Sequence, residues 1–183
     1  MLGAHTIILP KELGLSFDFE EDKPTFTENA LGKALALAES APKNMVVLAD
    51  DSGLCVDALG GGPGVRTARY GMETFGRQLE SDERNTFLLE NLAHLKSPSE
   101  RSAQFVCALA LVVDKHRIFT ICESVHGQIA ATGYGKGGFG YDPVFYVTEA
   151  GKTMAELTDD EKDHYSHRGR ATRHLITLLG EIS

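Results

Sequence analysis

Apolar residues recur at the spacing of a helix in several parts of the chain. The first series follows Thr25-Phe26-Thr27-Glu28, which has the Ser/Thr-x-x-Glu pattern of a capping box and predicts a helix to about Ser40. A second series follows Ser81-Asp82 and stops before Pro98. Another capping box, Thr158-Asp159-Asp160-Glu161, lies shortly before Ser166, which can cap a last helix through Ala171, Leu175, Ile176 and Leu179.

Runs of apolar and β-branched residues between these helices predict strands. The two longest are separated by a short polar turn, which is typical of a β-hairpin, and one run is continuously apolar, as in a strand buried on both faces. Because helices and strands mix along the chain without a linker or a repeat, the sequence predicts one α/β or α+β domain over residues 1–183. The predicted strands are His5–Leu9, Met45–Ala49, Ala103–Val113, Ile118–Ile129 and Pro143–Val147.

Charge and cysteine usage exclude several classes of protein. The 18 Lys and Arg against 26 Asp and Glu give a net charge of −8, which disfavours nucleic-acid and membrane-surface partners because both need a basic face. The 3 cysteines form no Cys-x-x-Cys pair, and this pattern disfavours a structural zinc site and a disulfide framework. No signal-peptide pattern opens the chain and no apolar stretch is long enough to span a bilayer, so we expect a cytoplasmic protein.

Two adjacent carboxylates follow the apolar run Met45–Ala49 in the segment Asp50-Asp51-Ser52-Gly53. Ligand sites of open α/β sheets lie beyond the carboxyl ends of strands, and neighbouring carboxylates need a counter-ion such as Mg²⁺. Successive side chains of a strand point to opposite faces, so we expect only one of the pair to meet a metal. The alternative is a structural turn, which Asp, Ser and Gly also favour.

Two later segments carry residues suited to a nucleotide. Phe139 lies between glycines in Gly137–Pro143, which suits an aromatic ring that stacks on a base; the alternative is a tight turn with Phe139 in the core. His167 and Arg168 lie at a predicted helix start with Lys162 upstream, where an anion would be attracted; a solvated helix start is the alternative. His164 and His167 lack a third metal ligand nearby, and Gly60–Gly64 fits a structural turn better than a phosphate loop.

The ordered set of these motifs resembles the inosine/xanthosine triphosphate pyrophosphatase family from about residue 5 to the end of the chain. Each segment alone is weak, but their order and spacing together are specific. The matching segments are Thr25-Phe26-x-Glu28-Asn29-Ala30, Ala49–Leu54, Asp57–Gly64, Ala68-Arg69-Tyr70, Gly138–Pro143, and Glu161-Lys162 with Ser166-His167-Arg168.

The resemblance implies an α/β fold with an elongated mixed central sheet, flanking helices in two lobes, an active-site cleft between them and a homodimer. It further implies Mg²⁺-dependent hydrolysis of ITP, dITP and XTP to the monophosphate and pyrophosphate. In this reading a 6-keto purine offers an acceptor to Arg168, whereas adenine offers a donor there and leaves the guanidinium unpaired. The implied residues are Asp51 as metal ligand and proton acceptor, Glu21 as a further metal ligand, Ser52 as a substrate contact, Phe139, Gly140, Tyr141 and Asp142 around the base, and Lys162, His167 and Arg168 completing the pocket.

One departure from the family pattern lies at the amino terminus. The family opens with a strand, a Thr/Ser-x-Asn-x-x-Lys loop that binds the triphosphate, and a helix, whereas Met1-Leu2-Gly3 begins where that helix would be ending. The alternative function is therefore a truncated, weakly active or inactive nucleotide-binding homologue. A receiver-like phosphoacceptor domain is disfavoured, because no separate acceptor Asp closes a later strand with a downstream Lys.

Overall fold

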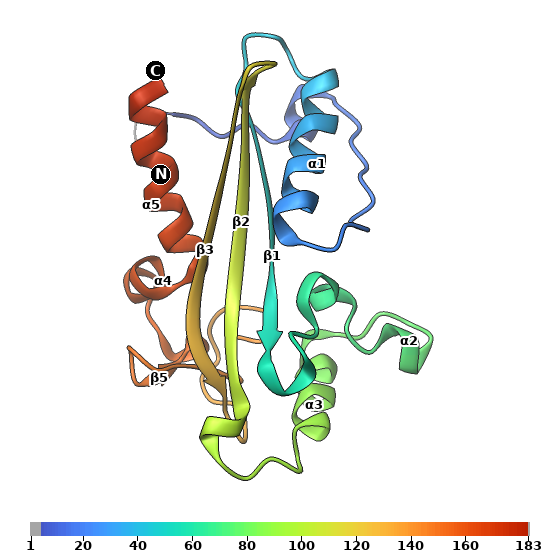
Figure 1. Ribbon diagram of the computed structural model, residues 1–183, viewed down its shortest axis with the longest axis vertical. Helices are drawn as coiled ribbons and strands as arrows, with labels where there is room; N and C mark the ends of the chain where they lie inside the picture. The colour runs from blue at the N-terminus through green and yellow to red at the C-terminus, as the bar shows by residue number, and fades with distance from the viewer. Residues whose placement is uncertain (1–4, 183) are drawn as a thin grey trace. The chain divides into compact units, whose positions relative to one another are not determined.

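The computed structural model describes residues 5–182 (Figure 1). One sheet has the strand order β1-β2-β3-β4-β5, and β4 pairs antiparallel with both β3 and β5. The strands are β1 (Val47–Val56), β2 (Ser102–Asp114), β3 (Arg117–Ile129), β4 (Phe145–Val147) and β5 (Lys152–Thr153). The helices are α1 (Phe26–Ser40), α2 (Met72–Phe75), α3 (Ser81–Asn91), α4 (Asp159–Tyr165) and α5 (His167–Ile182). The predicted α/β class and the predicted hairpin, which is β2–β3, are confirmed.

The chain divides into two compact units, which correspond to the two predicted lobes. Among the described residues, unit 1 contains residues 5–51, 107–123 and 171–182, and unit 2 contains residues 52–106 and 124–170. Strands β1, β2 and β3 therefore each contribute residues to both units.

In unit 1, α1 and most of α5 lie on opposite sides of the strands (Figure 1). Alternate residues of β2 pack against α5, since successive side chains of a strand point to opposite faces. The capping prediction for α1 is confirmed, because Thr25 Oγ1 accepts a hydrogen bond from the Glu28 backbone N–H at 3.2 Å. Small residues, Ala30 and Ala34, are fully buried on α1. The core between β2 and α5 consists of Cys107, Leu109, Leu111, Ala171, Leu175 and Leu179.

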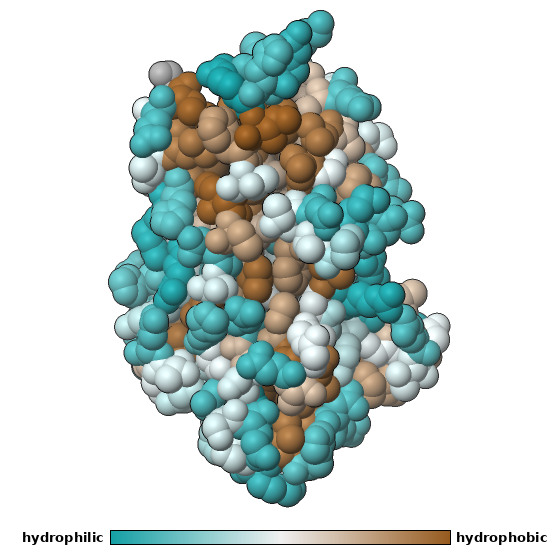
Figure 2. Space-filling view, in the orientation of Figure 1, coloured by the Kyte–Doolittle hydropathy of each residue, from teal (hydrophilic) through white to brown (hydrophobic). Residues whose placement is uncertain are grey.

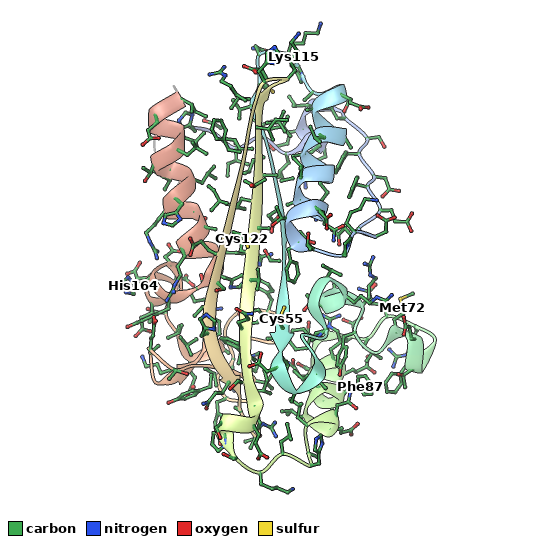
Figure 3. The ribbon with its side chains drawn as sticks, in the orientation of Figure 1. Cys55, Met72, Phe87, Lys115, Cys122 and His164 are labelled. Carbon is green, nitrogen blue, oxygen red and sulfur yellow. The ribbon has the colours of Figure 1, made fainter. Side chains whose placement is uncertain are left out.

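Unit 2 has its own core, built from β1, β2, β3, β4 and α3. The rings of Phe105 and Phe145 pack with centroids 4.5 Å apart, and Leu88 of α3 is fully buried beside them in the same cluster. Phe87, labelled on α3 in Figure 3, packs against Tyr70 at 5.1 Å. Arg101 is buried and satisfies its guanidinium by donating to the carbonyls of Leu92, Ile129 and Ala130. Arg101 thereby joins the end of α3 to the end of β3.

The predicted amino-terminal strand is wrong for the part that the structure describes. His5 forms only an isolated bridge, residues 6–9 belong to no strand, and the chain turns into a short 3₁₀ helix at Pro10–Leu13. Ile7 and Leu9 remain 62% and 48% exposed, because an extended apolar run is buried only where a neighbouring strand or helix covers it. They line a hollow of about 670 Å³ in unit 1 together with Met45, Leu48, Leu111 and Leu175. Figure 2 shows apolar side chains gathered over the strands of this unit.

The cysteines are free thiols on three different strands. Cys55 of β1 is half-buried, Cys107 of β2 is buried and Cys122 of β3 is exposed; Cys55 and Cys122 are labelled in Figure 3. Burial, with a smaller contribution from the Asp57 carboxylate, raises the pKa of the Cys55 thiol, so it stays protonated at neutral pH. No helix within residues 5–182 is long and apolar enough to cross a membrane.

Candidate active site

The adjacent carboxylates Asp50 and Asp51 lie inside β1, not beyond its carboxyl end. The prediction that the strand stops at Ala49 is wrong, and so is the alternative of a structural turn, because the strand continues to Val56. Gly53, Leu54 and Val56 are buried, so the segment after the acid pair is packed as a strand. The pleat separates the two side chains as expected: Asp51 is 7% exposed, whereas Asp50 is classed as exposed.

Helix α1 fixes the orientation of the Asp51 carboxylate. Asn29 is fully buried, and its Nδ2 donates a hydrogen bond to Asp51 Oδ2 at 2.9 Å. Asn29 is itself held, because its Oδ1 accepts from the Lys23 backbone N–H at 3.0 Å. A neutral amide therefore holds one oxygen of Asp51 in place without neutralising its charge.

A lysine of α1 joins Asp51 to Glu21. Lys33 Nζ lies 2.5 Å from Glu21 Oε1, 2.7 Å from the Asp50 carbonyl oxygen and 3.8 Å from Asp51 Oδ1. We call the Glu21 and Asp51 carboxylates with the Asp50 carbonyl the oxygen cluster. The structure thus brings together the two residues, Glu21 and Asp51, that the resemblance implies as metal ligands.

Lys33 was not among the site residues expected from the sequence, and Asn29 entered only as part of a motif. Both residues lie on α1 four positions apart, so they share one face of the helix. The available signal was the spacing of Asn29 and Lys33, two polar residues at positions i and i+4 within a stretch of Ala, Leu and Gly residues.

The oxygen cluster fits a hard divalent cation. Mg²⁺ prefers carboxylate and carbonyl oxygens and completes its shell with water or phosphate oxygens, and the cluster already surrounds one positive charge, the Lys33 ammonium. Within residues 5–182 no group of three or more His, Cys, Asp or Glu gathers into a fuller metal site. His164, labelled on α4 in Figure 3, is exposed and packs edge-on against Tyr165.

In unit 2, the segment Gly137–Pro143, here called the glycine-rich loop, is organised around Asp142. This carboxylate is 5% exposed, and its Oδ2 accepts from the Phe139 backbone N–H at 3.1 Å and from Lys162 Nζ at 2.7 Å. Lys162 comes from α4, whose predicted cap Thr158 is confirmed. Two of the predicted substrate-binding residues, Asp142 and Lys162, therefore form an ion pair, and Asp142 also holds the backbone N–H of Phe139.

Phe139 and Arg168 form the exposed part of this site. The Phe139 ring is 67% exposed, so the alternative that places it in the core is wrong. The Arg168 guanidinium carbon lies 5.3 Å from the ring centroid, a cation–π distance that holds the guanidinium beside the aromatic face. An exposed ring next to a planar hydrogen-bond donor can stack on a base and contact its edge.

Of the remaining predicted residues, Tyr141 and His167 are buried in unit 2. The Tyr141 side chain is 3% exposed and donates to the Thr67 carbonyl at 2.9 Å; burial raises the pKa of Tyr141, which keeps this donor protonated. His167 is 7% exposed and stacks on Phe105 at 4.9 Å. The Gly140 carbonyl accepts from Asn85 Nδ2 at 3.0 Å, and Ser52, half-buried in β1, directly follows Asp51. The structure thus places the Tyr141 and His167 side chains among packing residues of unit 2.

Two glycines of the loop allow a matched test of its geometry. Gly138 and Gly140 have φ of +78° and +59°, but only at Gly138 would a Cβ overlap Asp142 Oδ2 and Lys162 Nζ. We expect Gly140→Ala to destabilise the protein by about 1 kcal/mol, the cost of a left-handed conformation at a non-glycine residue. Gly138→Ala should in addition separate the ion pair and weaken the binding of IMP by at least about tenfold, since a displaced charge pair moves Phe139 with it. Calorimetric titration with IMP and the melting temperatures of both variants measure this; equal IMP affinity in the two variants would contradict it.

The chain is similar to known proteins of one family. The model of the Ham1 family matches residues 2–178. The dITP/XTP pyrophosphatase of Treponema denticola is 46% identical over 173 residues, 93% of this chain and 85% of the relative. The enzyme of the same name from Thermus thermophilus is 50% identical over 157 residues, 86% of this chain and 72% of the relative. The solved Ham1 protein of Staphylococcus aureus superposes with a TM-score of 0.84 at 38% identity, covering 98% of this chain and 88% of that chain. This chain belongs to the Ham1 family.

Proposed function

We propose that the protein hydrolyses non-standard purine nucleoside triphosphates, namely ITP, dITP and XTP, to the monophosphate and pyrophosphate. The observation that supports this best is the exposed Phe139 ring with the Arg168 guanidinium beside it, on a loop fixed by the buried Asp142–Lys162 pair. The names of the relatives from Treponema denticola and Thermus thermophilus give the same substrate class.

Base selection in this proposal depends on the group at position 6 of the purine, which Arg168 contacts. Inosine and xanthosine carry a keto oxygen at position 6, which accepts hydrogen bonds from the guanidinium, whereas adenosine carries an amino group that only donates there. A donor facing a donor leaves both groups unpaired, which is a strong source of discrimination. Phe139 contributes stacking, which all purines share, so it adds affinity without selecting among them.

Phosphate chemistry in this proposal depends on Asp51. Its carboxylate accepts a proton from the attacking water, whose oxygen forms a bond to the α- or the β-phosphorus, and the bond from that phosphorus to the bridging oxygen breaks. Attack at the α-phosphorus leaves the bridging oxygen on pyrophosphate, and attack at the β-phosphorus leaves it on the monophosphate. Asn29 keeps Asp51 Oδ2 oriented, so the acceptor need not reorganise during the step. Glu21 and Asp51 would hold Mg²⁺, which when bound neutralises charge on the triphosphate oxygens. A homodimer and a cytoplasmic location belong to the same proposal and rest on the resemblance of the motifs.

A coupled assay for pyrophosphate tests the proposal directly. Purified protein with ITP and Mg²⁺ should release pyrophosphate and IMP in equal amounts, and excess EDTA should stop the release. Orthophosphate as the product would contradict the proposed bond cleavage. Tight binding of IMP without release of pyrophosphate from ITP would instead favour the weakly active, nucleotide-binding homologue.

A further inference from the structure

The Lys33 ammonium group lies at the oxygen cluster of unit 1, whose oxygens are the candidate ligands for a metal ion. It contacts Glu21 Oε1 at 2.5 Å and the Asp50 carbonyl at 2.7 Å, with Asp51 Oδ1 at 3.8 Å. These are the hard oxygen donors that Mg²⁺ also selects. One set of oxygens cannot hold both cations at these distances, because two positive charges so close repel each other.

We propose that the Lys33 ammonium group occupies the oxygen cluster in the metal-free protein, and that metal binding displaces it. This inference rests on the proposed function only in assuming that the cluster binds a divalent ion. Lys33 would then hold Glu21 and Asp51 together in the metal-free protein, and it would weaken the binding of metal to the protein without nucleotide.

The surroundings of Lys33 suit such an exchange. The side chains of Lys33 and Asp51 are 17% and 9% exposed, so their attraction is screened less than that of a surface pair. Asn29 holds Asp51 Oδ2 by a neutral amide, so this carboxylate keeps its orientation whichever cation is present. A lysine has a flexible four-carbon stem, so the ammonium can leave the cluster without any movement of α1.

The first test compares metal affinities in protein without nucleotide. Mn²⁺, a paramagnetic substitute for Mg²⁺, is titrated and its free concentration read by electron paramagnetic resonance. We expect Lys33→Gln to bind Mn²⁺ at least about tenfold more tightly than the unmodified protein, because the competing charge is gone. The control is Lys23→Gln, which makes the same charge change at a surface pair, Lys23–Asp22, of 2.6 Å and should leave the affinity unchanged. Equal or weaker affinity in Lys33→Gln overturns the proposal.

The second test measures the response of the unmodified protein and needs a variant, Lys33→Arg, only to assign one signal. Lysine side chains are labelled with ¹³C at Cε, and the Lys33 signal is assigned as the one missing in Lys33→Arg. Addition of Mg²⁺ should move this signal toward the position of a solvated lysine and leave the Lys23 signal in place. A Lys33 signal that does not respond to Mg²⁺ overturns the proposal.

Failure here is distinguishable from failure of the proposed function. Pyrophosphate release from ITP is measured on the same preparations. Turnover of ITP together with unchanged metal affinity in Lys33→Gln would reject the role of Lys33 alone. Tighter metal binding in a protein that releases no pyrophosphate would support the role of Lys33 and reject the enzyme activity.

Discussion

Asp51→Asn should lower kcat for ITP by at least about a hundredfold while leaving the fold intact, since proton acceptance and metal binding each contribute orders of magnitude in rate. The fold should survive because an asparagine at this position still offers an oxygen to Asn29 Nδ2, which now lies 2.9 Å from Asp51 Oδ2. Initial rates of pyrophosphate release, with circular dichroism and the melting temperature of the variant, measure both parts of the expectation.

Asp50→Asn is the matched control for this result. Asp50 is the neighbouring residue of the same strand, but its side chain is exposed, and the atom that it gives to the oxygen cluster is a backbone carbonyl. The substitution keeps that carbonyl, so we expect kcat within about threefold of the unmodified protein, as for most surface changes. A loss in Asp50→Asn as large as that in Asp51→Asn, or full activity in Asp51→Asn, would show that the roles are assigned wrongly.

The second large effect concerns the choice of base. We expect kcat/KM for ITP and XTP to exceed that for ATP by at least about a hundredfold, because the Arg168 guanidinium pairs with a 6-keto oxygen but faces another donor, the 6-amino group, on adenine. Arg168→Ala should reduce the ratio of kcat/KM for ITP to that for ATP by about tenfold or more, with the loss mainly in KM for ITP. Steady-state kinetics with ITP, XTP and ATP measure the ratio.

Arg66→Ala is a suitable control for the loss of a positive charge. Arg66 is another arginine of unit 2 with a side chain 66% exposed, and it pairs with Glu73 outside the glycine-rich loop. If the preference for ITP over ATP fell equally in Arg168→Ala and Arg66→Ala, the effect would come from the loss of a positive charge and not from contact of Arg168 with the base. Comparable kcat/KM for ITP and ATP in the unmodified protein would contradict the assignment of Arg168 altogether.

Local signals in the sequence predicted most of the elements correctly. The cap at Thr25, the capping box at Thr158 and the cap at Ser166 mark the starts of α1, α4 and α5, and the structure confirms all of them. The hairpin of β2 and β3 followed from two long apolar runs around a short turn. These predictions succeed because a cap or a tight turn depends on side chains within a few residues of one another.

The boundaries and the burial of several segments depended on contacts distant in sequence. The run at the amino terminus has the composition of a strand, yet residues 6–9 pair with no strand in the described structure. The acid pair looked like the end of a strand, yet β1 continues through it, because its later residues pack into the core of unit 2. The composition of a segment indicates which secondary structure it favours. The neighbouring strands and helices that cover its faces decide whether that structure forms.

The sequence by itself determined the fold class, the capped helices, the hairpin and the set of motifs that identify the family. Only the tertiary structure brought Glu21 and Asp51 onto one lysine of α1, and only it showed Phe139 exposed beside Arg168. Residues 21, 33 and 51 come from a loop, a helix and a strand, so no spacing along the chain encodes their distances. Helical periodicity could place Asn29 and Lys33 on one face, but which carboxylates that face meets depends on how α1 packs against the sheet.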